Sequence, residues 1–122
     1  MKFYICEVCG NIITHVNASD VPVFCCGQKM RELVPGTVDA SLEKHVPVYR
    51  VEGNLVHVKV GSVEHPMLAE HSIQWVAVES RQGVQIKYLQ PGQAPEASFA
   101  LADDDELVAV YEYCNLHGLW KA

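Results

Sequence analysis

The chain has 122 residues, of which 49% are hydrophobic, and a formal net charge of −6. This is enough apolar material for a folded core, whereas the acidic balance, with no basic run, excludes nucleic acid and anionic membranes as expected partners. No run of about 18 apolar residues occurs, so no membrane-spanning helix is predicted. The first residues reach Cys6 before the apolar region of a signal peptide could form. The odd number of cysteines, 5, then favours metal binding in a reducing cytoplasm over a disulfide framework.

Four of the cysteines form two pairs near the N-terminus, and the members of the second pair are adjacent in sequence: Cys6 and Cys9, then Cys25 and Cys26. Four thiolates in two pairs suit a tetrahedral metal, either Zn²⁺ or a single iron. A glycine follows each pair, where we expect a positive φ that turns backbone amides toward the sulfurs. A segment of about 35 residues cannot hold itself together by apolar burial alone, so the metal is predicted to stabilise it.

The same N-terminal segment contains short candidate strands at 12–14 and 21–24, with a turn at 17–20 between them. A further strand is expected over 30–34, and the dipeptide Pro35-Gly36 would end it. We therefore predict a small module of residues 1–36 and a second domain of residues 37–122.

From residue 37 onward the apolar residues recur with a period of two, which is typical of strands. Strands are predicted over 48–51, 55–60, 72–80, 84–88, 97–101 and 107–113. The turn at 52–54 predicts a hairpin between the first two of them. Roughly seven such strands in about 85 residues predict an immunoglobulin-like β-sandwich. Since no segment shows helical periodicity, the chain is predicted to be all-β.

Four histidines and the fifth cysteine lie at the expected strand ends and in the loops between strands: His45, His65, His71, Cys114 and His117. Loops of this kind can cluster at one end of a sandwich. Imidazole and thiolate are the side chains that transition metals prefer. We interpret the five residues as one iron site, although each histidine alone could be an ordinary loop residue.

Other conspicuous residues are expected to lie outside the site. His57 alternates with valines and should face solvent, and His15 has no partner pattern in the small module. Trp75 and Trp120 are interpreted as aromatic residues that pack in the core or around the site. The acidic run 103–106 is interpreted as a solvated turn.

Four segments carry a resemblance to a known family: Glu43–Pro47, His65–Met67, His71–Trp75 and Cys114–Trp120 resemble the superoxide reductases. The adjacent cysteines resemble the desulforedoxin module, a rubredoxin-like FeS4 unit. Together, over residues 1–122, the chain resembles desulfoferrodoxin, the two-iron form of the family. The resemblance implies a desulforedoxin-like module followed by a neelaredoxin-like seven-stranded β-sandwich.

The resemblance also implies two Fe ions per chain, with one FeS4 centre at the four N-terminal cysteines. In the second centre His45, His65, His71 and His117 would surround a non-haem iron, Cys114 would be the axial thiolate, and the opposite position would stay open. A thiolate donates electron density along the axis, as a cysteine ligand does to haem iron. The implied reaction is the one-electron reduction of superoxide to hydrogen peroxide, without producing dioxygen.

Two further residues gain roles from the resemblance. Lys44 would supply positive charge beside the open position, where local charge decides the approach because the net charge is screened beyond about 8–10 Å. Glu43 resembles the carboxylate that closes onto the open position once the iron is ferric. A rubredoxin-like electron donor and a homodimer are likewise implied.

Three alternatives stay open at this stage. A cysteine with nearby histidines on a β-sandwich also resembles a cupredoxin-like copper site, and the four-cysteine unit alone could serve a rubredoxin-like electron carrier. A cupredoxin-like copper site normally uses two histidines, a cysteine and a weakly bound methionine. The N-terminal cysteines also permit a structural zinc module, since zinc prefers four ligands.

Overall fold

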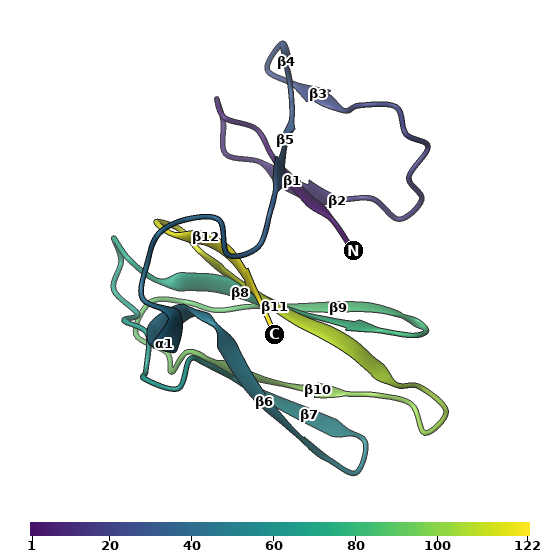
Figure 1. Ribbon diagram of the computed structural model, residues 1–122, viewed down its shortest axis with the longest axis vertical. Coiled ribbons are helices and arrows are strands. Elements are labelled where there is room, and N and C mark those ends of the chain that lie inside the picture. Colours follow the sequence, from purple (N-terminus) through teal and green to yellow (C-terminus); the bar gives the residue numbers. More distant parts are fainter. The chain divides into compact units, whose positions relative to one another are not determined.

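Strands dominate the chain, as Figure 1 shows. The computed structural model describes all of residues 1–122 and contains strands β1 to β12 with one short helix, α1. The prediction of an all-β chain is confirmed. The chain divides into two units, Met1–Val34 and Pro35–Ala122. Because α1 spans only four residues, no helix of the structure is capable of crossing a membrane.

The first unit contains a three-stranded antiparallel sheet of order β2-β1-β5 and a separate two-stranded hairpin, β3-β4. Their bounds are β1 Phe3–Ile5, β2 Ile12–Thr14, β3 Phe24–Cys25, β4 Gln28–Lys29 and β5 Arg31–Leu33. The predicted strand at 12–14 is confirmed. The predicted strand at 21–24 is wrong, since only Phe24 of it pairs. Pro22 lies in the unpaired part and has no N–H to donate to a ladder.

The second unit contains seven strands in two antiparallel sheets, which confirms the predicted sandwich. The sheet of order β10-β7-β6 has three strands and the sheet of order β12-β11-β8-β9 has four. Their bounds are β6 Pro47–Glu52, β7 Leu55–Val60, β8 Ile73–Ser80, β9 Gly83–Tyr88, β10 Glu96–Ala100, β11 Leu107–Cys114 and β12 Gly118–Lys121. The hairpin between β6 and β7 is present at the predicted turn.

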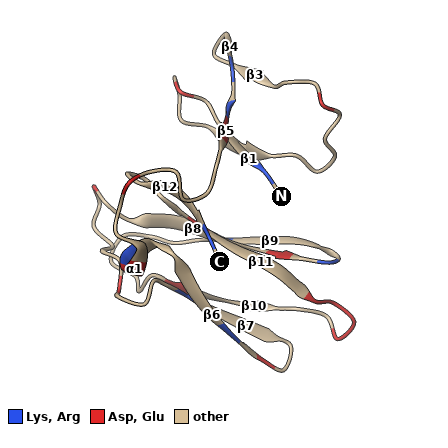
Figure 2. Ribbon diagram, viewed as in Figure 1, with Lys and Arg blue, Asp and Glu red and all other residues tan.

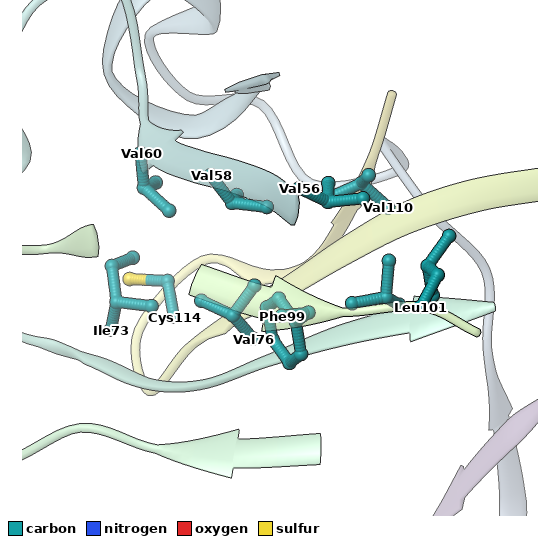
Figure 3. Close-up of a cluster of buried hydrophobic side chains, with 10 residues drawn as sticks. Val56, Val58, Val60, Ile73, Val76, Phe99, Leu101, Val110 and Cys114 are labelled. Carbon is teal, nitrogen blue, oxygen red and sulfur yellow. The ribbon is translucent and has the colours of Figure 1, made fainter. Parts of the chain in front are cut away.

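The core of the second unit lies between its two sheets, as Figure 3 shows. Val56, Val58 and Val60 alternate along β7, and all three are buried while the residues between them are not. Burying one such side chain contributes about 1.5–3 kcal/mol relative to leaving it exposed. Cys114 belongs to the same cluster, and Figure 3 places its sulfur beside Ile73. Packing in the core therefore fixes the position of one predicted metal ligand, Cys114.

One short helix is present, although the sequence showed no segment with helical periodicity. Helix α1 (Leu42–His45) begins after Ser41. It is followed by Val46, which has an extended backbone and whose N–H donates to the Leu42 carbonyl at 2.9 Å. Pro47 disfavours helical backbone at the residue before it, which ends the helix there. The turn places Lys44 and His45 in consecutive positions at its end. Figure 2 shows blue, the colour of Lys and Arg, at α1.

The acidic run 103–106 forms the exposed turn between β10 and β11, red in Figure 2. It is more than a solvated turn. Asp105 accepts hydrogen bonds from the Ser80 hydroxyl at 2.6 Å and from the Gln82 N–H at 3.1 Å. These bonds hold the turn to the hairpin of β8 and β9. They also lower the pKa of the Asp105 carboxyl, the Ser80 hydroxyl having the largest effect.

Candidate metal centres

Helix α1 and the turn after β7 each present one histidine with a fixed tautomer. His45 Nδ1 lies 2.7 Å from the Ser41 carbonyl oxygen, and His65 Nδ1 lies 2.6 Å from that of Pro66. A carbonyl oxygen only accepts, so both Nδ1 atoms carry the proton. The free lone pair of each ring is consequently on Nε2. Orienting a histidine through its second nitrogen is the usual arrangement for metal ligands.

The unprotonated Nε2 atoms of His45 and His65 point at each other, and a nitrogen of His117 lies beside them. His45 Nε2 lies 3.2 Å from His65 Nε2 and 3.0 Å from His117 Nδ1. Burial lowers the pKa of His45, and lowers that of His65 to about 4. Both rings are therefore neutral at pH 7, and no proton bridges their Nε2 atoms. Two nitrogens bound at right angles about 2.1 Å from one ion would be about 3.0 Å apart. The observed distances fit a metal between them.

His71 completes a closed circuit of four rings. The ring centroids of successive neighbours lie 4.7 Å apart for His45 and His65, 4.6 Å for His65 and His71, 5.1 Å for His71 and His117, and 4.8 Å for His117 and His45. Every neighbouring pair is edge-on, with interplanar angles from 78° to 89°. His71 Nε2 is buried without a hydrogen-bond partner. A buried polar atom without a partner is costly, and a bound metal would satisfy it.

Cys114 and His117 flank the tight turn that joins β11 to β12, and Gly118 closes it with a φ of +79°. Cys114 Sγ lies 3.8 Å from His117 Nδ1. Burial raises the pKa of the Cys114 thiol, against the effect of the Leu116 and His117 backbone amides. A cation is thus required to hold it as a thiolate at neutral pH. Trp120 donates its indole N–H to the His117 carbonyl at 3.1 Å and packs on the His45 ring.

All five predicted ligands of the second domain come together. One ligand atom from each lies within 4.8 Å of every other, in what we call the histidine–cysteine group: His45, His65, His71, Cys114 and His117. A cavity of about 350 Å³ opens on this group. It is lined by all four histidines and by Ala40, Ser41, Lys44 and Pro66. The Cys114 thiol does not line it. The cavity is therefore a small imidazole-lined opening with one lysine at its wall.

Glu43 differs from Lys44 in its placement. Its side chain is exposed and does not line the cavity. Its own backbone amide, and then the Ser41 hydroxyl, lower the pKa of the Glu43 carboxyl. The group is thus a carboxylate at neutral pH. The backbone carbonyl oxygen of Glu43 accepts hydrogen bonds from the Val63 N–H at 2.9 Å and from the Ser62 hydroxyl at 3.3 Å.

A buried acid lies near the site along strand β11. Glu112 precedes Cys114 by two residues on β11, is fully buried, and has no hydrogen-bond partner for either carboxylate oxygen. Burial raises the pKa of Glu112 to about 9. The side chain is therefore a neutral carboxylic acid at pH 7.

The first unit brings its thiols together as the four-cysteine group: Cys6, Cys9, Cys25 and Cys26. Cys9 Sγ lies 3.6 Å from Cys25 Sγ, and Cys25 Sγ lies 4.0 Å from Cys26 Sγ. Cys26 adopts a φ of +51°, so the backbone bends between the adjacent cysteines. This bend explains how neighbouring residues that would diverge on a strand can share one centre.

The glycine after each pair has the predicted positive φ, +82° at Gly10 and +73° at Gly27. The backbone amides of Cys9 and then Val8 lower the pKa of the Cys6 thiol to about 6. Contacts with Cys9, Cys6 and Cys25 raise the pKa of the Cys26 thiol to about 12. The four thiols therefore cannot all ionise together without a cation, which fits a bound metal.

The two histidines excluded by the sequence lie elsewhere. His15 packs edge-on against Tyr4 in the first unit. His57 lies half-buried on β7, with Nδ1 2.8 Å from the Ser98 hydroxyl and Nε2 3.3 Å from a Glu52 oxygen. Both tryptophans are buried, as expected. The carbonyls of Ser41 and Pro66 were not predicted, because backbone acceptors leave no signal in a sequence.

Comparisons with known proteins cover both units. Residues 37–122 match the family model described as Desulfoferrodoxin, and residues 1–33 match the one described as Desulfoferrodoxin, N-terminal domain. A desulfoferrodoxin homolog of Archaeoglobus fulgidus is 47% identical over 122 residues, 100% of this chain and 96% of that protein. A superoxide reductase of Thermococcus kodakarensis is 32% identical over 96 residues, 65% of this chain and 84% of that protein. The crystal structure of the superoxide reductase from Treponema pallidum has a TM-score of 0.84 at 43% identity, covering 99% of this chain and 97% of that one.

Proposed function

The chain belongs to the desulfoferrodoxin family, and from this premise we propose that it is a superoxide reductase. The reaction adds one electron and two protons to superoxide and gives hydrogen peroxide, with no dioxygen released. The observation that carries the proposal is the convergence of four imidazoles and one buried thiol beneath a small cavity with a lysine at its wall.

The two groups match the two iron centres of the family. We propose that the histidine–cysteine group holds the catalytic iron and that the four-cysteine group holds the FeS4 iron. Bound in the histidine–cysteine group, iron supplies the single electron by changing between its ferrous and ferric states. Five protein donors exceed the four that zinc prefers, which favours iron there.

The chain's own residues prepare this site in three ways. The Ser41 and Pro66 carbonyls hold His45 and His65 with Nε2 turned inward. Burial keeps these rings neutral, so they do not cancel the negative charge of the thiolate. The cavity of about 350 Å³ admits a small anion, and Lys44 lines it with positive charge.

The proposed reaction is tested by three measurements on the same preparation. The full chain, loaded with iron and supplied with a reductant, should consume superoxide and form one hydrogen peroxide for each superoxide. An oxygen electrode should detect no dioxygen release above the uncatalysed background. Metal analysis should give two Fe per chain. One peroxide and one dioxygen for every two superoxide ions consumed would indicate dismutation instead and would contradict the proposal.

Replacing Lys44 by alanine should slow the encounter with superoxide by about tenfold at low salt, the lower end of the range for electrostatic steering. The rate should also become less dependent on ionic strength, because the charge at the cavity wall is gone. Stopped-flow kinetics at several salt concentrations measure both effects. Lys59→Ala is the matched control, since it removes an equal charge from an exposed position on β7. Equal rates for the Lys44 and Lys59 variants would refute the role of Lys44.

Replacing Glu43 by alanine should spare the reduction of superoxide but change the visible spectrum of the oxidised protein. The reason is that a hard carboxylate oxygen suits Fe³⁺ as a ligand in the resting oxidised enzyme. Glu64→Ala is the control, because it removes another exposed carboxylate from the turn before His65. If both variants keep the spectrum of the unaltered protein, Glu43 is not a ligand.

The electron-carrier alternative has less support. A cupredoxin-like site needs a weak methionine ligand, and the methionine nearest in sequence to the ligand histidines is Met67. Its sulfur accepts the Ile73 N–H at 3.3 Å, and its side chain packs against the core. Copper in the purified protein would revive this alternative.

We also propose that residues 1–36 form an electron-handling module and residues 37–122 the catalytic domain. The division into units at Val34 and Pro35 supports this boundary. The reductant would be a rubredoxin-like protein, and the family resemblance supports a homodimer, which sedimentation velocity can test. Five free cysteines, all in metal-binding groups, support a cytoplasmic location.

A further inference from the structure

Asn115 ties two separate parts of the histidine–cysteine group together. It follows Cys114 directly, at the start of the turn that carries His117. Its Oδ1 accepts from the Ser72 N–H at 3.0 Å, and its Nδ2 donates to the Glu70 carbonyl at 3.0 Å. Its own N–H donates to the Ser72 carbonyl at 3.2 Å. Asn115 thus bonds to the residue on each side of His71.

His71 needs such a tie more than the other histidines do. The rings of His45 and His65 are each oriented by a carbonyl acceptor. The structure contains no hydrogen bond to the ring of His71, whose Nε2 is buried without a partner. His71 also lies outside any strand, and its backbone exchanges hydrogen bonds only with nearby Leu68, at 2.9 and 3.2 Å. Apart from its edge-on contacts with His65 and His117, the position of this ring therefore depends on its backbone.

We propose that Asn115 is a positioning residue that holds the His71 imidazole in the metal-binding group. The proposal rests on the proposed function, in which His71 is an iron ligand. A side-chain amide both accepts and donates, so it can bond to an N–H on one side of His71 and to a carbonyl on the other. Neither aspartate nor alanine can do both. Since Asn115 adjoins Cys114, the tie also fixes the imidazole relative to the thiolate.

The test measures Fe²⁺ affinity of the histidine–cysteine group in the full chain, by competition with a ferrous chelator. Asn115→Ala should weaken binding by about 10–100-fold, the usual effect of removing a group that orients a metal ligand. Asn115→Asp, which keeps the acceptor for Ser72 and loses the donor to Glu70, should fall between. Leu116→Ala is the matched control, because this exposed neighbour in the same turn makes no side-chain bond to the His71 loop. It should leave the affinity unchanged.

A double-mutant cycle shows whether Asn115 acts through His71. In a His71→Ala background, Asn115→Ala should weaken binding by no more than about threefold, because the ligand it positions is absent. Equal losses in both backgrounds would mean a general effect on the fold and would overturn the inference, as would unchanged affinity in Asn115→Ala. If His71→Ala itself leaves the affinity unchanged, the proposed ligand set fails instead. In the metal-free chain, hydrogen exchange at the Ser72 amide should accelerate in Asn115→Ala but not in Leu116→Ala. Unchanged exchange would also count against the tie.

Discussion

Replacing Cys114 by alanine is expected to abolish superoxide reduction by the chain. The thiol is fully buried at the end of the core, and it is the only sulfur of the histidine–cysteine group. Alanine leaves four imidazoles and removes the only anionic donor among the five residues of the group. Because losing even an outer partner of a ligand costs about 10–100-fold, we expect the rate to fall by more than about 100-fold.

Two measurements separate this effect from damage to the core. Stopped-flow reduction of superoxide gives the rate, and the visible absorption of the oxidised protein reports the sulfur–iron bond. Val110→Ala is the control, since Val110 is fully buried in the same cluster on the same strand. It should lower stability while keeping both the rate and the absorption. A Cys114→Ala chain with the unaltered absorption would show that this thiol is not a ligand.

Glu112→Gln should change how stability depends on pH. The pKa of Glu112 is raised to about 9 in the folded chain from an ordinary value of 4.5. Its contribution to stability is fully present below pH 4.5 and is lost progressively as the pH rises toward 9. By linkage, the unaltered chain should lose about 3 kcal/mol relative to the glutamine variant between pH 5 and pH 7. The difference should keep growing up to about pH 9.

Urea unfolding of both metal-free chains, measured at each pH, gives this difference directly. Burying the glutamine amide changes the free energy of unfolding of the variant by the same amount at every pH. The informative quantity is therefore the slope of the free energy of unfolding against pH. Glu96→Gln, an exposed carboxylate on β10, is the control and should leave the pH dependence unchanged. Parallel curves for Glu112→Gln and the unaltered chain would show that the buried acid has an ordinary pKa.

The sequence was most informative where burial alternates. On β7 the valines face the core and the residues between them do not, so period two identifies the strand. It was least informative for short elements. The three residues of β1 are too few to show a period, and β12 was not predicted because its residues carry the turn motif after Cys114. The single turn of α1 likewise has no periodic signal.

The predicted ligands of both metal sites were identified from residue type, spacing and family resemblance, and the structure gathers them into two groups. What the sequence could not give is orientation. That His117 turns Nδ1 toward its neighbours while His45 and His65 turn Nε2 depends on backbone carbonyls and on the turn at Gly118. The role inferred for Asn115 was equally hidden, because an asparagine beside a cysteine has many possible partners.

The turn after β7 restricts how the substrate side of the protein can move. A side chain at Gly61 would place its Cβ only 2.5 Å from the Glu43 carbonyl oxygen, which Val63 and Ser62 also hold. These contacts tie the backbone at Glu43 to the segment leading to His65. Rotation about the side-chain bonds of the exposed Glu43 would bring its carboxylate toward the cavity without breaking any of them, over a reach of at most one glutamate side chain.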